Sequence, residues 1–211
     1  MSSVVDAEIT ALTPRAELMA VLRVAAVVVV LVAAYLYVPV GTTGGDGRQA
    51  ARNLLPFQAL IEAHDAADQK MFRSLQVALI EAQNLRAAEG KWPDVAAMAE
   101  QGIDPFTIDP TNKGARYTWR TFRNGLTTNY LGIPDADTAP AWLLVVQEPD
   151  PAAPPEIYTN DEEHAKLLDG TVLHVGIWRH ANGARVPAAA VRLPQAEGWS
   201  QVFAVGPSAS H

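Results

Sequence analysis

The sequence predicts an α+β domain joined to one membrane-spanning helix, with a long amphipathic helix ahead of an antiparallel β-sheet. Three patterns indicate this class: an uncharged apolar run at 24–40, apolar residues spaced three and four apart at 71–85, and period-two alternation from 116 onward. The length of 211 residues fits one domain plus an accessory segment. Helices that precede a run of strands are typical of the α+β class.

The apolar run has the length and flanks of an uncleaved membrane anchor. Residues 24–40 are dominated by Val, Ala and Leu, and residues 18–22 extend the run on the other side of Arg23. About 20 helical residues cross the hydrocarbon core of a bilayer, and an arginine near one end can reach the headgroups. Three acidic residues precede the run and no small-residue cleavage site follows it, which favours an anchor over a signal peptide.

The positive-inside rule places the N-terminus in the cytoplasm, because Arg15 and Arg23 lie at the first end of the anchor. We therefore expect a single-pass protein of the bacterial inner membrane with its C-terminal domain in the periplasm. The predicted segments are a cytoplasmic segment at 1–17, the transmembrane helix at 18–40, a Gly-rich spacer at 41–47, an extracytoplasmic α+β domain at 48–205 and a tail at 206–211.

Composition excludes some functions. The chain carries 16 basic and 23 acidic residues, a net charge of −7, so a nucleic-acid partner is disfavoured. It contains no cysteine, which excludes disulfides, thiolate nucleophiles and cysteine-based zinc sites.

The helices are predicted from spacing and capping signals. Residues 48–89 read as one long helical region, bent at Pro56 and ended by Gly90. Trp92-Pro93-Asp94 begins a short second helix that runs to about Gly102.

The strands follow, four to six in number and antiparallel. Residues 116–121 alternate, and Arg123-Asn124-Gly125 offers a tight turn into a strand at 126–133. Further strands are predicted at 141–148, 171–180 and 199–205, with a Pro-rich loop at 149–155, a short helix from Asn160 or Asp161 to Leu168, and a turn at Asn182-Gly183.

Gly90, Trp92 and Pro93, followed by Asp109, Pro110, Gly114 and Tyr117, resemble the loop between helix and sheet in the pseudopilins and related pilin-like proteins. This resemblance covers about a third of the chain and implies a pilin-like order of elements. No Gly-Phe processing site precedes the apolar run, so filament assembly is not implied. The whole chain is also similar to an uncharacterised family of small bacterial single-span membrane proteins, a resemblance that implies a link to metal-uptake transporters.

Histidines are the candidate metal ligands. His64 and Asp68 are four residues apart on a predicted helix, and Asp161 and His164 are three apart, so each pair can present two adjacent ligands. His174 is the candidate third ligand, supplied from a neighbouring element. Capping and solvated surface explain the same residues without metal. No cofactor is otherwise predicted.

The predicted function is non-catalytic: a membrane-anchored interaction domain, the accessory of an envelope or transport assembly. Tyr117, Trp119 and Trp178 are its candidate interface anchors, with packing against the long helix as the alternative. A second hypothesis is a zinc-handling accessory of a metal-uptake system. A third is a hydrolase, although Ser200 lies in no Gly-x-Ser-x-Gly elbow.

Overall fold

The computed structural model describes residues 54–108, 114–154 and 157–205. The chain divides after Asp46 into two units, and every described residue lies in the second. Within the described ranges, no helix combines the length and apolarity that crossing a bilayer requires. The predicted membrane helix at 18–40, the spacer at 41–47 and the tail at 206–211 lie outside the described residues.

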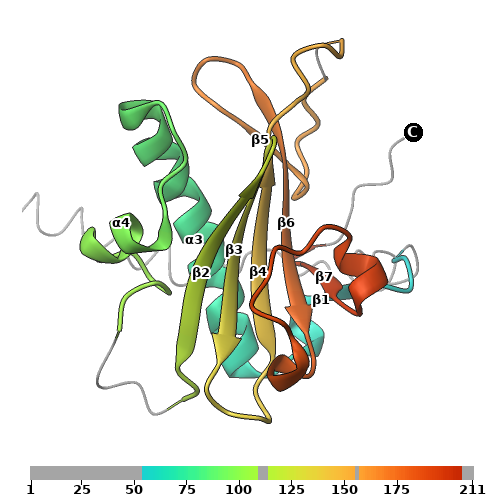
Figure 1. Ribbon diagram of the computed structural model, residues 1–211. Helices are drawn as coiled ribbons and strands as arrows, with labels where there is room; N and C mark the ends of the chain where they lie inside the picture. The colour runs from blue at the N-terminus through green and yellow to red at the C-terminus, as the bar shows by residue number, and fades with distance from the viewer. Residues whose placement is uncertain (1–53, 109–113, 155–156, 206–211) are drawn as a thin grey trace, which may run out of the picture. The chain divides into compact units, whose positions relative to one another are not determined.

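The second unit is a mixed β-sheet with a long helix along one face (Figure 1). The strand order is β1-β7-β6-β4-β3-β2, and β5 also pairs with β6. The strands are β1 Gln58–Leu60, β2 Tyr117–Asn124, β3 Thr127–Pro134, β4 Ala141–Gln147, β5 His164–Lys166, β6 Val172–His180 and β7 Ser200–Phe203. The helices are α3 Ala66–Glu89, α4 Val95–Glu100 and the short 3-10 helices η1 Ile61–Ala63, η2 Gly183–Arg185 and η3 Pro194–Glu197. The predicted α+β class is confirmed.

Helix α3 confirms the three-and-four spacing but is shorter than predicted. Its buried face includes Phe72, Leu75, Ala78 and Ala82, and it ends at Gly90, which has φ 73°. The prediction of helix from 48 was wrong over 54–65, which holds a turn, β1 and η1. The Asp65 side chain accepts a hydrogen bond from the Asp68 backbone N–H, and this cap starts the helix after residue 65.

The predicted hairpin is confirmed one residue later than expected. Asn124 pairs with Thr127, so the two-residue turn is Gly125-Leu126, with Gly125 at φ 58°. The predicted strands that became β4, β6 and β7 are also confirmed. The expectation of an entirely antiparallel sheet was wrong, because β1 pairs parallel with β7.

The predicted helix from Asn160 or Asp161 to Leu168 was also wrong. The Asp161 carboxylate accepts from the Glu163 backbone N–H, two residues on, which forms a local turn instead of a helix cap. The following residues form β5, which pairs with β6. Gly170, at φ 89°, belongs to the turn between these two strands. An aspartate at the start of a short segment is compatible with either structure, and the pairing with β6 determines which one forms.

The sheet separates two apolar cores, because successive side chains of a strand point to opposite faces. One core lies between the sheet and α3, and its fully buried members include Tyr130, Trp142, Leu144 and Leu173. The other lies on the opposite face, which we call the outer face, under the segment 186–199. It contains Leu131, Leu143, Trp178, Val191 and Trp199.

Candidate functional site

The edge of β6 that faces away from β4 is shared by two strands. Near its start, β6 pairs with β5 through residues 172–174, and near its end it pairs with β7 through Trp178 and Arg179. Val175, Gly176 and Ile177 lie between the two partners, and the Val175 backbone N–H donates to the Glu163 carbonyl. Figure 1 shows β5 and β7 at different heights along β6. We call this interruption the split edge.

The split edge is hollowed on both faces of the sheet. On the α3 side, a cavity of about 200 Å³, which we call the slot, has walls from α3, β5, β6 and β7. Its apolar lining includes Phe72, Leu79, Ile80, Leu144, Ile177 and Val202. On the outer face, a cavity of about 340 Å³ is lined by residues that include Phe57, His174, Trp178 and Val191. Val175, Gly176 and Gln201 line both cavities, so the split edge is the wall that they share.

Gly176 allows this arrangement because Trp178 lies across it. A Cβ added at Gly176 would stand 2.6 Å from the Trp178 indole nitrogen. The indole is in turn stacked on Phe57, with 6.2 Å between ring centroids. A side chain at position 176 would therefore displace Trp178, which lines the outer cavity.

Two glutamates hold the segment before β5 against the end of β7. The Glu162 carboxylate accepts hydrogen bonds from the backbone N–H groups of Ala204, at 2.6 Å, and Val205, at 2.7 Å. The Glu163 carboxylate accepts from the Gln201 side-chain amide at 2.9 Å. Charge-assisted bonds of this kind are stronger than neutral ones. They hold the segment before β5 to β7 and to the two residues after it, although β5 and β7 do not pair.

His164 and His174 meet beside the slot. They are opposite partners in the β5–β6 pairing, and their ring centroids are 4.7 Å apart. The Asp161 carboxylate lies 2.7 Å from His164 Nδ1, and the Thr159 hydroxyl lies 2.8 Å from the same atom. Burial opposes ionisation of Asp161, but the hydrogen bonds from Thr159, His164 and the Glu163 backbone outweigh it and lower the pKa of this carboxyl.

His64 and Asp68 form a separate polar cluster with Arg179. Asp68 is 5% exposed, its carboxylate accepts from Arg179 Nε at 2.8 Å, and His64 Nδ1 lies 3.7 Å from the same carboxylate. Arg179 is five residues from His174 along β6, about 16 Å at strand spacing. The structure therefore keeps the two predicted ligand pairs apart. Within the described ranges, no three His, Asp or Glu side chains are grouped as a metal site would require.

Comparison with known proteins gives one family. A family of unknown function, DUF6162, matches residues 59–205, from β1 to the residues just after β7. The chain belongs to this family. The match spans more than half of the chain and includes the split edge with all of its lining strands. Curated proteins and solved structures were also compared, and neither comparison found a match. The expected membership of an uncharacterised family is confirmed, whereas the pilin-like resemblance finds no support.

The three predicted interface aromatics of this family member lie in or beside the cores. Trp119 packs edge-on against Phe106, with 5.1 Å between ring centroids. Tyr117 is half-buried, and burial, with the Asp68 carboxylate adding to it, raises the pKa of the Tyr117 hydroxyl to about 12. Trp178 is 8% exposed and lines the outer cavity. Their role as interface anchors stays a prediction.

Some residues of the site carried little or no local signal in the sequence. Gln201 and Glu162 are ordinary polar residues whose importance arises from contacts 38 and 42 positions away along the chain. Gly176 could have been singled out, because a glycine inside a strand pattern often marks a close approach.

Stability should depend on pH through His64. Burial, followed by the nearby Arg179 charge, lowers the pKa of His64 below its ordinary value of 6.5. The unfolded chain then binds a proton that the folded chain does not, so stability is complete above pH ~6.5 and falls as the pH drops toward the folded pKa. We expect chemical denaturation to show a smaller loss between pH 7.5 and 5.5 for His64→Gln than for wild type. Equal losses would contradict this assignment.

Proposed function

We propose that this protein is a membrane-anchored, non-catalytic interaction domain that lies outside the cytoplasm and serves an envelope or transport assembly. The slot carries the proposal. At about 200 Å³ it is smaller than the ~300–1,000 Å³ of usual small-molecule sites, and it suits one apolar side chain of a partner protein. The apolar run at 18–40 supports the anchor.

The rim of the slot supports the same function. Ile80 lines the slot and Val77 lies one turn before it on α3, and each is 56% exposed. Large apolar side chains that stay exposed beside an apolar cavity are typical of protein-binding surfaces. The partner would insert an anchor residue into the slot and cover these two side chains.

Site-specific photocrosslinking in intact bacteria tests this proposal with the full-length chain. A photoreactive residue in place of Ile80 should give one discrete adduct with an envelope protein, identified by mass spectrometry. Gln76→Trp, which narrows the slot from α3, should abolish that adduct while the membrane-bound amount of the protein stays the same. The control is the same photoreactive residue at Lys70, which is exposed on α3 outside the slot lining. Identical adducts from both positions, or an adduct unaffected by Gln76→Trp, would refute the slot as a docking site.

A zinc-handling accessory is the second candidate, favoured by the approach of His164 to His174. Imidazoles 4.7 Å apart, with the Asp161 carboxylate on His164 Nδ1, resemble the carboxylate-oriented histidines of zinc proteins. Further ligands would come from water or from the partner.

Zinc titration of the full-length chain by calorimetry separates the two candidates. The accessory should bind about one zinc per chain, lose it in His164→Ala and His174→Ala, and bind it more weakly as the pH is lowered, because zinc ligands must be deprotonated. His180→Ala is the control, because His180 lies six residues from His174 on the same strand. Absence of binding by the wild-type chain would exclude zinc handling.

A further inference from the structure

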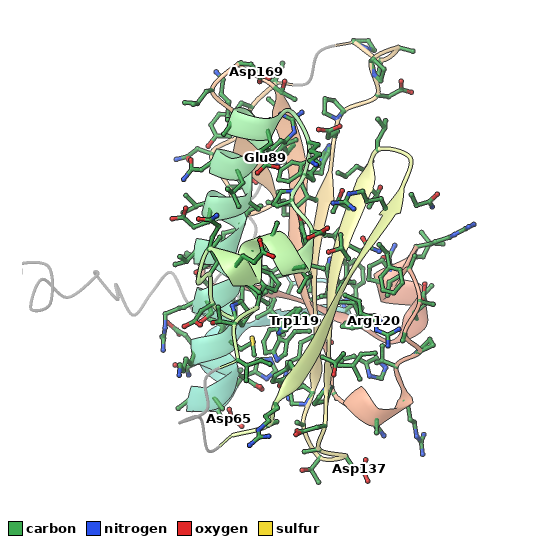
Figure 2. The ribbon with its side chains drawn as sticks, turned by 60° about the vertical axis from the view of Figure 1, so that its left-hand side comes forward. Asp65, Glu89, Trp119, Arg120, Asp137 and Asp169 are labelled. Atoms are coloured by element: carbon green, nitrogen blue, oxygen red, sulfur yellow. The ribbon has the colours of Figure 1, made fainter. Side chains whose placement is uncertain are left out.

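Strand β2 forms an open edge of the sheet. The strand order ends at β2, whose only partner strand among the described residues is β3. At eight residues it is longer than β1, the three-residue strand at the opposite edge. In Figure 2 it is the strand nearest the viewer, with Trp119 on the α3 side and Arg120 on the outer face.

The hydrogen-bond pattern identifies which backbone groups face away from the sheet. In an antiparallel pair, successive residues of a strand alternate. One residue exchanges backbone hydrogen bonds with its partner, and the next points its N–H and C=O groups away from the partner strand. The Asp135 N–H donates to the Arg116 carbonyl at 2.8 Å, so the even-numbered residues of β2 bond to β3. The N–H and C=O groups of the odd-numbered residues therefore point outward, and in the described part of the chain they form no backbone hydrogen bond. These residues are Tyr117, Thr121, Trp119 and Arg123.

Two exposed arginines lie along this edge, although the whole chain is acidic. Arg116 and Arg120 are exposed, share the outer face of the strand and lie about 13 Å apart. Neither forms an ion pair in the described part of the chain. The exposed arginines oppose edge-to-edge pairing with a second copy, because like charges would then lie across from each other.

We propose that β2 receives an extended, acidic segment of a partner protein, which adds a strand to the sheet. The outward backbone groups supply the hydrogen bonds, and carboxylates four residues apart on the segment face Arg116 and Arg120. The half-buried Phe122, on the same face, favours an apolar residue opposite it. This inference rests on the interaction role proposed above but assigns it a second surface, so either surface can fail alone.

Peptide titration of the full-length chain tests the proposal by fluorescence anisotropy. The probe is a labelled octapeptide of sequence Thr-Glu-Thr-Val-Thr-Glu-Thr-Val. Two matched peptides serve as controls. The first carries Lys in place of each Glu. The second carries N-methyl groups on alternate residues, which remove backbone donors and leave the side chains intact. The unmodified acidic peptide should bind, and both matched peptides should not.

A second test measures binding of the same acidic peptide to charge-reversed variants of the protein. Arg116→Glu combined with Arg120→Glu should weaken binding of the acidic peptide by about tenfold or more, since two favourable pairs become repulsive. Lys70→Glu combined with Arg73→Glu makes the same charge change on exposed positions of α3 and should leave binding unchanged. Circular dichroism checks that both variants fold.

Three results would overturn the proposal. Equal binding of the N-methylated peptide would mean charge attraction without strand pairing. An equal loss of peptide binding in the Lys70→Glu and Arg73→Glu control would mean a general charge effect. A dimer of the free protein that the β2 substitutions disrupt would mean that a second copy occupies the edge. None of these results bears on crosslinking at the slot, so failure here leaves the slot proposal intact.

Discussion

Asp68→Ala should destabilise the domain by about 3–5 kcal/mol, because it leaves the Arg179 guanidinium partly buried without its carboxylate. The Asp68 carboxylate accepts a hydrogen bond from Arg179 Nε at 2.8 Å, and the pair joins α3 to β6. Removal of one partner of a buried ion pair costs more than the pair itself contributes. Urea denaturation of wild type and variant at pH 7.5 measures the difference in the free energy of unfolding.

A second substitution separates the lost charge pair from lost packing. Asp68→Leu combined with Arg179→Met replaces both charges by apolar side chains and should recover most of the stability, because desolvated charges are no longer present. If the double variant were as unstable as Asp68→Ala, the ion pair would not explain the loss.

Trp142→Ala should cost about 3–5 kcal/mol, since it removes the largest fully buried side chain of the core under α3. Trp142 is 0% exposed and lies in β4 at the centre of the strand order, so the neighbouring strands cannot collapse into the space without breaking their pairing. The same denaturation experiment measures the loss.

Leu168→Ala provides the comparison for Trp142→Ala. Leu168 is 97% exposed, and its truncation should change the free energy of unfolding by no more than about 0.5 kcal/mol. A small loss for Trp142→Ala, close to that of Leu168→Ala, would contradict the described position of Trp142.

The elements with strong local signals were predictable from the sequence. Apolar spacing predicted most of α3, the Asn124-Gly125 pair predicted the β2–β3 hairpin, and alternation at 116–121 predicted β2. The strands β1 and β5 were missed, because each has three residues and is defined by pairing with a partner elsewhere in the chain. Such short strands have no period of their own.

The candidate site was predictable only in part, for the same reason. His164 and His174 were identified as candidate ligands, but their approach depends on the β5–β6 register. That register could not be predicted, because residues 160–168 were assigned to a helix. The slot depends on where β5 ends and β7 begins along β6, a property of the assembled sheet and not of any segment.

The pairing of β1 with β7 has a consequence for the order of folding. Gln58 lies beside Gln201, so the first strand of the sheet depends on a strand made 143 residues later. During synthesis β1 emerges first but has no partner until the last strand follows, while the β2–β3 hairpin can form from neighbouring residues. A chain that stops before residue 200 would keep α3 and the central strands but leave β1 without a neighbour, and the slot would lack the wall that β7 supplies.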